Sequence, residues 1–174
     1  MERQELAKKI YGIAHITGDF LLRSGARSNE YFDKYRFESN PEVLKAIAEQ
    51  MIPLLPKDFD YLAGLEMGGI PIVTAISMLC GKPAVFVRKK AKEYGTCLFA
   101  EGADIKGKKL VIIEDVVTSA GQIVISTGDL RSAGAKIETA LCVIDREAGG
   151  RANLEKAGLS LSPLFTMTEL KANA

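Results

Sequence analysis

Residues 110–122 read Leu110-Val111-Ile112-Ile113-Glu114-Asp115-Val116-Val117-Thr118-Ser119-Ala120-Gly121-Gln122. The unbroken apolar run Leu110–Ile113 is typical of a parallel strand that is buried on both faces. Two adjacent carboxylates, Glu114 and Asp115, follow at the predicted end of that strand. A turn of small residues comes next, and the spacing of apolar residues predicts a helix over Ile123–Ala133. The stretch therefore predicts one strand–turn–helix unit of a parallel sheet.

Short apolar strands alternate with helices through most of residues 60–145. This alternation predicts an α/β fold, a Rossmann-like parallel sheet flanked by helices on both faces. Strands are predicted at Tyr61–Leu65, Ala84–Val87, Leu110–Ile113, Ile137–Ile144 and Leu164–Met167, and helices at Pro71–Leu79, Ile123–Ala133 and Asn153–Ala157. Ligands of such sheets bind beyond the carboxyl ends of the strands. The segments that follow the first four strands are therefore the candidate sites.

The first 60 residues lack this alternation. The elements predicted there are a helix over residues 3–15, strands at Phe20–Arg23 and Tyr31–Phe37, and a helix that begins at Pro41, is capped by Asn40 and stops near Pro53. A chain of 174 residues suits one domain with a full core. We therefore expect a single domain, residues 1–174, in which residues 1–60 form a hood and residues 61–174 form the parallel-sheet core.

Composition excludes several classes of function. The formal net charge is +1, whereas a dedicated nucleic-acid binder usually has a large basic excess. No apolar run is long enough to span a bilayer, and the charged N-terminus lacks the apolar region of a signal peptide. The only histidine, His15, falls in the first helical pattern and is expected to be structural, which leaves no histidine triad. The three cysteines, Cys80, Cys97 and Cys142, are too widely spaced for a zinc site and favour a reducing cytoplasm.

The turn after the central strand has the chemistry of a sugar-phosphate site. Small side chains at Thr118–Gln122 let the backbone approach a phosphate closely, and the N-terminus of the following helix favours an anion. Glu114 and Asp115 can accept hydrogen bonds from ribose hydroxyls, directly or through a metal ion. The alternative is that these carboxylates only cap the helix.

Residues 110–122 resemble the phosphoribosyl pyrophosphate (PRPP) signature of type I phosphoribosyltransferases: an apolar strand, two acidic residues, two apolar residues, then Thr and small residues. They match neither a Walker A loop nor a dinucleotide-binding fingerprint. The resemblance implies that PRPP is held by the residues at the end of the strand and in the turn. These are Glu114, Asp115, Val116, Val117, Thr118, Ser119, Ala120, Gly121 and Gln122.

A basic segment, Arg88-Lys89-Lys90-Ala91-Lys92-Glu93-Tyr94-Gly95, follows the strand Ala84–Val87. Its cations repel one another, which predicts a segment that stays mobile until an anion neutralises it, although a solvated basic turn is the alternative. The segment is similar to the Arg-Lys-x-x-Lys-x-[His/Tyr]-Gly loop of orotate phosphoribosyltransferases. That resemblance implies a homodimer in which Arg88, Lys89, Lys92 and Tyr94 close over the pyrophosphate of the neighbouring subunit, with Lys92 as the acid toward the leaving group. Tyr94 stands where some members have histidine.

Three further segments resemble the same family. Phe20–Gly25, Ser28 and Tyr31-Phe32-Asp33 resemble its base-binding pattern, in which Arg23 replaces a lysine. Arg146, after the last buried strand, is the candidate for the carboxylate of orotate. The implied orotate-binding residues are Arg23, Tyr31, Phe32, Thr118 and Arg146. Without the resemblance, Tyr31 and Phe32 would be taken as core residues, and Arg146 with Glu147 as a surface charge cluster.

The segment Gly64–Pro71 resembles the pyrophosphate loop and adds Met67 and Gly68 to the implied PRPP-binding residues. Some members have a lysine where Gly68 stands, so its absence places more of the anion binding on backbone N–H groups, Mg²⁺ and the basic loop. Together these resemblances imply a cytoplasmic, Mg²⁺-dependent orotate phosphoribosyltransferase of pyrimidine synthesis, with Glu114, Asp115 and Lys92 in catalytic roles. Mg²⁺ is expected to bind mainly through substrate oxygens. The alternatives are transfer to a purine or uracil, or a non-catalytic sensor of PRPP.

Overall fold

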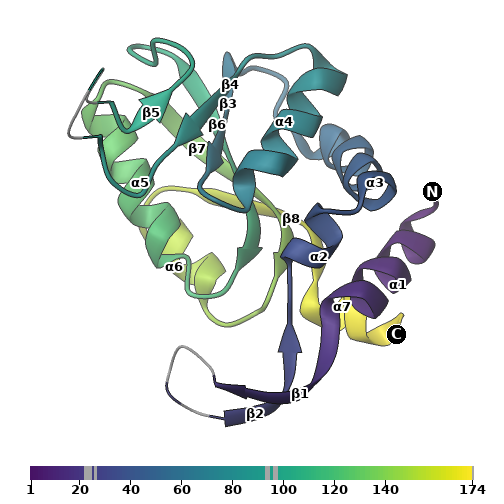
Figure 1. The fold of residues 1–174 in the computed structure, drawn as a ribbon. Helices are drawn as coiled ribbons and strands as arrows, with labels where there is room; N and C mark the ends of the chain where they lie inside the picture. Colours follow the sequence, from purple (N-terminus) through teal and green to yellow (C-terminus); the bar gives the residue numbers. More distant parts are fainter. Residues whose placement is uncertain (22–24, 26, 93–94, 96–97, 174) are drawn as a thin grey trace.

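The computed structural model describes residues 1–21, 25, 27–92, 95 and 98–173. A six-stranded sheet forms its centre, in the order β5-β4-β3-β6-β7-β8 (Figure 1). The strands are β3 (Tyr61–Leu65), β4 (Ala84–Val87), β5 (Ala100–Glu101), β6 (Lys109–Val117), β7 (Lys136–Asp145) and β8 (Ser160–Thr166). All neighbouring pairs are parallel except β4 and β5, which are antiparallel. The predicted α/β fold with a central parallel sheet is confirmed.

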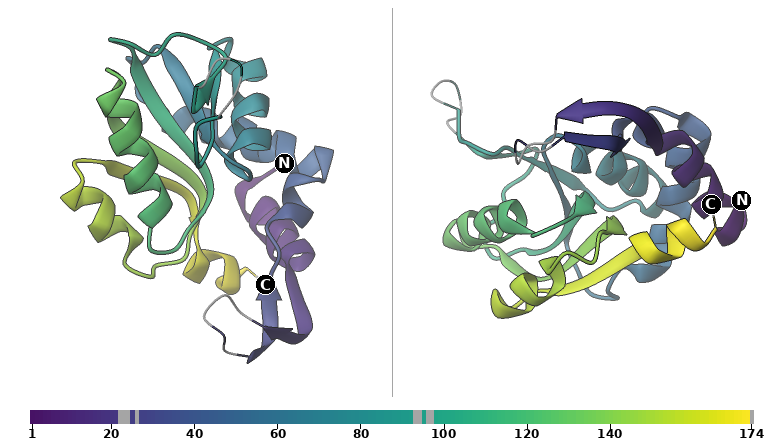
Figure 2. Two further views of the ribbon diagram at one scale, coloured as in Figure 1. Left: turned by 60° about the vertical axis from the view of Figure 1, so that its left-hand side comes forward. Right: turned by 90° about the horizontal axis from the view of Figure 1, so that it is seen from below.

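Helices cover both faces of the sheet. Three helices, α1 (Arg3–Ala14), α3 (Pro41–Met51) and α4 (Gly69–Cys80), lie on one side, and α5 (Gly121–Ser132) and α6 (Gly150–Lys156) lie on the other (Figure 2). Each side has its own apolar cluster, because successive strand residues point to opposite faces. On β6, for example, Ile113 belongs to the first cluster and Ile112 to the second. The sheet is therefore buried on both faces, as the apolar strands predicted.

The chain order changes direction between β3 and β6. From β3 the chain passes through α4 to β4 on one side, whereas β6 pairs with the opposite side of β3. The carboxyl ends of β3 and β6 thus diverge to helices on opposite faces and leave a crevice between them. This switch point coincides with the acidic segment that the sequence singled out.

Residues 1–60 contribute to the core as well as to a projecting hairpin. Leu6 and Ile10 of α1 and Val43 and Ile47 of α3 are fully buried in the first apolar cluster. The hairpin of β1 (His15–Leu21) and β2 (Arg27–Phe32) extends away from the sheet (Figure 1). A single turn of helix, α2 (Tyr35–Glu38), returns the chain to α3, which leads into the short helix η1 (Ile52–Leu54). The hairpin is thus the part of residues 1–60 that projects as a hood.

Several predicted boundaries are wrong, and the reasons are local. The strand predicted over Tyr31–Phe37 ends at Phe32, because the Asp33 side chain accepts the N–H of Tyr35 (3.2 Å) and starts the α2 turn that buries Phe37. His15 is the first residue of β1 rather than part of a helix, and β1 begins before the predicted Phe20.

The C-terminal boundaries also differ. The last strand ends at Thr166, where a capping box between Thr166 and Glu169 starts helix α7 (Met167–Ala172), which the sequence analysis did not predict. The short strand β5 was also missed, because two residues carry no periodic signal. By contrast, the predicted start of α3 is confirmed: the Asn40 side chain accepts the N–H groups of Glu42 and Val43, both at 3.1 Å.

Candidate functional site

A hollow of about 250 Å³ lies where β6 meets α5. Its lining residues come from four places that are far apart in the sequence. They are Lys34, Glu66, Lys89 and the continuous run from Glu114 to Ile123. The whole acidic strand end and small-residue turn therefore face one cavity at the switch point of the sheet. Larger hollows of about 440 and 590 Å³ lie elsewhere and are lined by none of the predicted site residues.

The two carboxylates belong to β6 itself and do not follow its end, which corrects the predicted boundary. The strand continues to Val117 because the long strand β7 keeps pairing with it, Glu114 opposite Cys142 and Val117 opposite Asp145. Helix α5 is capped by the backbone of Ala120, not by a side chain. The alternative in which Glu114 and Asp115 serve only as helix caps is therefore wrong.

The turn between β6 and α5 is held in an anion-binding shape. Ala120 adopts a left-handed conformation (φ 61°), which is strained for a residue with a Cβ and turns the chain sharply into α5. Gly150 packs directly beneath the turn, since a Cβ there would lie 2.5 Å from the Thr118 carbonyl oxygen. The Asn153 amide donates to the Ser119 carbonyl (3.0 Å). The turn is thereby fixed from below, with the N-terminus of α5 directed at the hollow.

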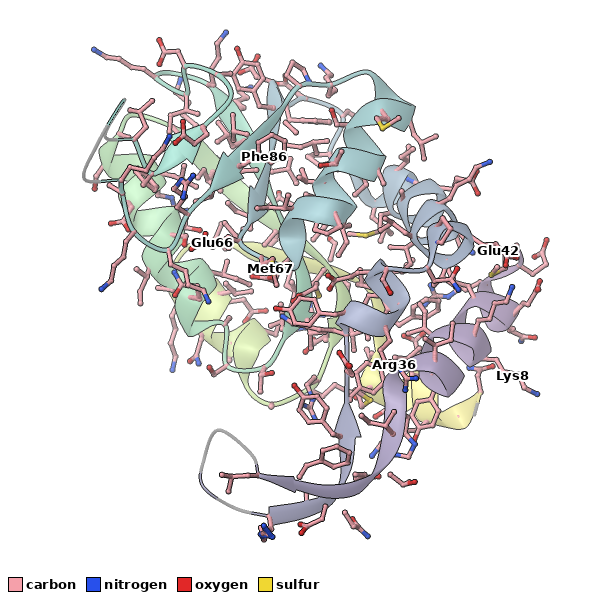
Figure 3. The ribbon with its side chains drawn as sticks, viewed as in Figure 1. Lys8, Arg36, Glu42, Glu66, Met67 and Phe86 are labelled. Carbon is pink, nitrogen blue, oxygen red and sulfur yellow. The ribbon has the colours of Figure 1, made fainter. Side chains whose placement is uncertain are left out.

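The pyrophosphate-loop segment after β3 packs against Asp115. Gly68 touches this carboxylate so closely that a Cβ would lie 1.5 Å from Asp115 Oδ2. Glu66 accepts the backbone N–H of Lys89 (2.7 Å), and its peptide bond to Met67 is cis. Figure 3 marks Glu66 and Met67 at the end of β3. Met67 is exposed, and neither it nor Gly68 lines the hollow.

Three carboxyl groups gather around a single lysine at the floor of the hollow. Asp115 is 1% exposed and pairs with the Lys34 ammonium, and Glu38 beside them is 6% exposed. Burial, and then the neighbouring Asp115 carboxylate, raise the pKa of Glu38 to about 8. Burial and Asp115 likewise raise the pKa of Glu114 well above its ordinary value. The site is thus an acidic cluster whose charge is partly suppressed by burial.

The raised pKa of Glu38 predicts how stability depends on pH. Because the folded chain binds this proton more tightly than the unfolded chain, the stabilisation is complete below the ordinary pKa of 4.5 and is lost as pH rises through about 8. The Tm of the wild type should therefore fall, relative to that of Glu38→Gln, as pH increases from about 5 to about 9. Thermal unfolding over that pH series is the measurement. Glu155→Gln on α6 serves as an exposed control, and parallel curves for wild type and Glu38→Gln would contradict the assignment.

A second hollow, of about 170 Å³, lies between the hairpin and the end of β7. Its lining is aromatic and cationic. The residues are Tyr11, His15, Ser28, Glu30, Tyr31, Phe32, Arg146, Met167 and Lys171. The backbone N–H of Arg146 donates to the Val117 carbonyl (2.9 Å), so this hollow and the first one lie against the same strand end. Three of the predicted orotate-binding residues, Tyr31, Phe32 and Arg146, are brought together here, whereas Thr118 lines the first hollow.

The simpler alternatives for these three residues fare differently. Tyr31 is 45% exposed and is not a core residue, whereas Phe32 is half-buried against the core. The Glu147 carboxylate accepts the N–H (2.9 Å) and the hydroxyl (2.6 Å) of Thr168. Glu147 is thus bonded to Thr168, and Arg146 lines the second hollow.

The described residues of the basic segment lie at the edge of the sheet, and of these only Lys89 lines the first hollow. Lys92 pairs with Glu101 of β5, and Arg88 Nε lies 3.5 Å from the same carboxylate. This contact lowers the pKa of Glu101, mainly through the hydrogen bond from Lys92. The chain therefore supplies its own counter-ion to two of the four cations, which the expectation of simple mutual repulsion did not include.

Two predicted site residues, Arg23 and Tyr94, lie outside the described residues. Residues that the sequence analysis did not name as site residues include Lys34 and Glu66 at the first hollow, Glu38 beside Asp115, and Lys171 at the second hollow. His15, which the sequence analysis expected to be structural, pairs with Glu30 at 2.8 Å and also lines the second hollow. Only Lys34 carried a usable signal, since it is a cation directly after the aromatic–aromatic–Asp motif. The others come from elements whose proximity depends on the tertiary fold.

Within the described ranges, no group of three or more His, Cys, Asp or Glu side chains is arranged to hold a metal ion. The same part of the chain contains no helix with the length and apolar character required to cross a membrane.

Known proteins are similar to this chain in sequence and in fold. A family model described as "Phosphoribosyl transferase domain" matches residues 36–162. An orotate phosphoribosyltransferase from Nocardioides sp. is 48% identical over 167 residues, covering 96% of this chain and 93% of the relative. One from Methanocella arvoryzae is 43% identical over 153 residues, covering 88% and 87%. The crystal structure of orotate phosphoribosyltransferase from Aeropyrum pernix superposes with a TM-score of 0.84 at 29% identity, covering 96% of both chains.

Proposed function

The chain belongs to the orotate phosphoribosyltransferase family, and from this membership we propose how its two hollows carry out the transfer. The reaction joins orotate to the phosphoribosyl group of PRPP, yields orotidine 5′-monophosphate and pyrophosphate, and serves pyrimidine synthesis. One observation carries the assignment of the site. It is the cavity at the switch point, in which two carboxylates of β6 and the entire turn before α5 line the same space.

The donor is assigned to the first hollow. The 5′-phosphate fits the turn Thr118–Gln122, where backbone N–H groups and the N-terminus of α5 favour a dianion. The ribose hydroxyls fit Glu114 and Asp115, whose carboxylate oxygens accept hydrogen bonds. The diphosphate then extends toward Lys89, which follows β4, and toward Met67 and Gly68, which follow β3. This placement uses the PRPP-binding residues that the sequence predicted.

Orotate is assigned to the second hollow. The guanidinium of Arg146 suits a carboxylate, because its planar fork can donate two parallel hydrogen bonds. The rings of Tyr31 and Phe32 offer apolar contact to a flat pyrimidine. Since Arg146 is bonded through its backbone to the end of β6, the base and the ribose would meet at that strand end. Arg23 is also proposed to bind orotate at this pocket.

Bond formation requires no nucleophilic side chain. A ring nitrogen of orotate attacks C1 of the ribose and releases its proton to solvent, the bond from C1 to the pyrophosphate oxygen breaks, and its electron pair leaves with pyrophosphate. The transition state resembles an oxocarbenium ion, so the protein contributes mostly position and electrostatic stabilisation. Glu114 and Asp115 hold the ribose, and Lys92 gives a proton to the leaving oxygen.

Mg²⁺ is the proposed cofactor. This ion is usually bound by one or two carboxylates together with substrate phosphates, and the carboxylates beside the first hollow fit that donor set. Mg²⁺ would be held mainly by pyrophosphate and ribose oxygens and would neutralise charge on the leaving pyrophosphate.

We further propose that the enzyme is a homodimer in the cytoplasm. In the described structure Arg88 and Lys92 face Glu101 rather than the first hollow of their own chain. This arrangement suits a loop that serves the site of a neighbouring subunit. The free thiols of Cys80 and Cys142 are compatible with a reducing compartment.

A turnover assay tests the proposed function. The chain is mixed with PRPP, Mg²⁺ and orotate, and pyrophosphate release is measured, with adenine, hypoxanthine and uracil in parallel reactions. Turnover with orotate alone is expected. Turnover only with another base would assign a different acceptor, and binding of PRPP without turnover of any base would indicate a sensor.

Arg146→Ala should specifically weaken the use of orotate. Loss of a charge-assisted hydrogen bond costs about 1.5–3 kcal/mol, so the KM for orotate should rise about 10- to 100-fold. The KM for PRPP serves as the internal control and should change little. Arg146→Lys should recover only part of the affinity, because an ammonium lacks the planar fork. Equal changes in both KM values would remove Arg146 from base recognition.

A further inference from the structure

Lys34 is placed where none of the motifs put a functional residue. It lies between the hairpin and α2, and its ammonium pairs with Asp115 Oδ2. It also lines the first hollow, opposite the turn that precedes α5. Its side chain is 32% exposed, so the ammonium is accessible from the cavity although it contacts a buried carboxylate.

The backbone holds Lys34 firmly in this position. The N–H of the preceding residue, Asp33, donates to the Ala14 carbonyl (2.8 Å) at the end of α1. The Lys34 carbonyl accepts the N–H of Phe37 (3.2 Å), and Phe37 is fully buried in the core. These bonds anchor the backbone at Lys34, and from that position its ammonium reaches Asp115 on β6.

The acidic cluster needs a cation at this point. Asp115 and Glu38 are almost completely buried, and Glu114 lies beside them. Like charges in a poorly solvated site disfavour one another's ionised form. Burial lowers the pKa of Lys34, but its contact with Asp115 and its proximity to Glu114 more than offset that effect, so the pKa is raised. Lys34 therefore carries its charge and opposes proton uptake by its neighbours.

Position 68 cannot supply that cation in this chain. A Cβ at Gly68 would lie 1.5 Å from Asp115 Oδ2 and 2.4 Å from Asp115 Cγ. Any side chain there would displace the carboxylate that Lys34 holds. Of the described residues that line the first hollow, the cations are Lys34 and Lys89, and Lys34 is the one paired with the acidic strand.

We propose that Lys34 is a positioning residue for the donor: its ammonium holds the Asp115 carboxylate in place at the cavity, where that carboxylate receives a ribose hydroxyl. The inference rests on the proposed function, because it assumes that the first hollow takes PRPP. The bonds from Lys34 to Asp115 and from Asp115 to the ribose would form one continuous chain. Lys34 also offsets the repulsion between the acidic cluster and a polyanionic donor.

Four variants of the full-length protein test this role. Lys34→Met and Lys34→Gln remove the charge, and Lys34→Arg keeps it. Lys9→Met is the matched control, because Lys9 also forms one ion pair (2.7 Å, with Glu42), has a similarly exposed side chain (35%) and lies in α1 outside both hollows. Steady-state kinetics, calorimetric binding of PRPP with Mg²⁺ and thermal unfolding are measured for each.

The KM for PRPP should rise about 10- to 100-fold in Lys34→Met and Lys34→Gln, since one charge-assisted contact is lost. The KM for orotate should stay near the wild-type value, Lys34→Arg should recover most of the affinity for PRPP, and Lys9→Met should behave as wild type. Lys34→Gln can still hydrogen-bond Asp115, so it tests the role of the charge even where the methionine variant folds poorly.

Three results would overturn the inference: PRPP binding within about twofold of wild type in folded Lys34→Gln, an equal loss in Lys9→Met, or no recovery in folded Lys34→Arg. The proposed function fails separately, if the wild-type chain does not turn over orotate. In that case calorimetric uptake of PRPP by wild type and Lys34→Gln still decides the role of Lys34.

Discussion

Lys92→Ala should lower kcat by about 10²- to 10⁴-fold, which is the usual contribution of a positioned acid or base, while leaving the fold intact. The structure gives the reason for an intact fold: among the described residues, the Lys92 ammonium pairs with the Glu101 carboxylate and its backbone N–H donates to the Leu98 carbonyl (3.4 Å), both at the sheet edge. The effect should fall on kcat more than on the KM for orotate, because the proton is needed by the leaving group. Steady-state kinetics with saturating orotate and PRPP provide the measurement.

The neighbouring Lys90→Ala is the matched control. Lys90 is exposed, lies in the same segment and has no place in the family's loop pattern. It removes the same charge from the loop, so a general effect of basicity would appear in both variants. Near-normal turnover in Lys92→Ala would take the loop lysine out of the mechanism.

Asp115→Asn should lower kcat/KM for PRPP by about 100-fold. The amide keeps the size of the side chain, but it replaces a charged acceptor, and one hydrogen bond to a charged group is worth up to about 3 kcal/mol. The change also leaves the Lys34 ammonium without its carboxylate partner, at a position where the side chain of residue 115 is only 1% exposed. Kinetics and calorimetry with PRPP measure the loss.

Asp60→Asn is the control for this substitution. Asp60 accepts the backbone N–H of Lys109 (2.8 Å) at the opposite end of β6, so the same chemical change is made on the same pair of strands, far from the cavity. A similar loss of activity in both variants would mean that Asp115 acts through stability alone, and unchanged kinetics in Asp115→Asn would remove it from ribose binding.

Mixing the two impaired variants, Lys92→Ala and Asp115→Asn, tests whether the loop serves a neighbouring subunit. Random exchange of equal amounts gives about half mixed dimers, and each mixed dimer contains one site with both native residues if the loop acts in trans. Activity should then recover to about a quarter of that of the wild type. No recovery after confirmed subunit exchange would place the loop in the site of its own chain.

The sequence predicted most of the sheet, and the residues after Ile113 that it proposed for PRPP lie together in one cavity, because both rest on contiguous residues. The run from Leu110 to Gln122 contains a buried strand, its acidic end and the turn, and all the residues from Glu114 onward line one cavity. The prediction failed where contacts join distant segments. Nothing near Glu101 in the sequence identifies it as the partner of Lys92. Glu38 joins the acidic cluster only because α2 folds back onto β6 and brings it beside Asp115.

The boundary of β6 shows a second reason. An apolar run predicts where a strand is buried, but pairing by the backbone decides where the strand ends. Since β7 extends to Asp145, β6 remains paired to Val117, beyond the change from apolar to acidic side chains. The alternation of side chains in a strand then separates Glu114 from Asp115 and directs Asp115 to Gly68 and Lys34.

The short strand β5 limits how far the basic loop can travel. The loop leaves β4 and returns as β5, and its base is clasped by the bond from the Arg88 N–H to the Phe99 carbonyl (2.7 Å) and by the pairing of Phe86 with Glu101. The ten residues between Arg88 and Phe99 therefore begin and end at adjacent anchored points. Because both ends are anchored at one place, the ten residues can reach at most half of their extended length from it, which is about 17 Å. A loop can serve the neighbouring chain only if the two chains are arranged so that the cavity of one lies within about 17 Å of the Arg88–Phe99 bond that anchors the loop of the other.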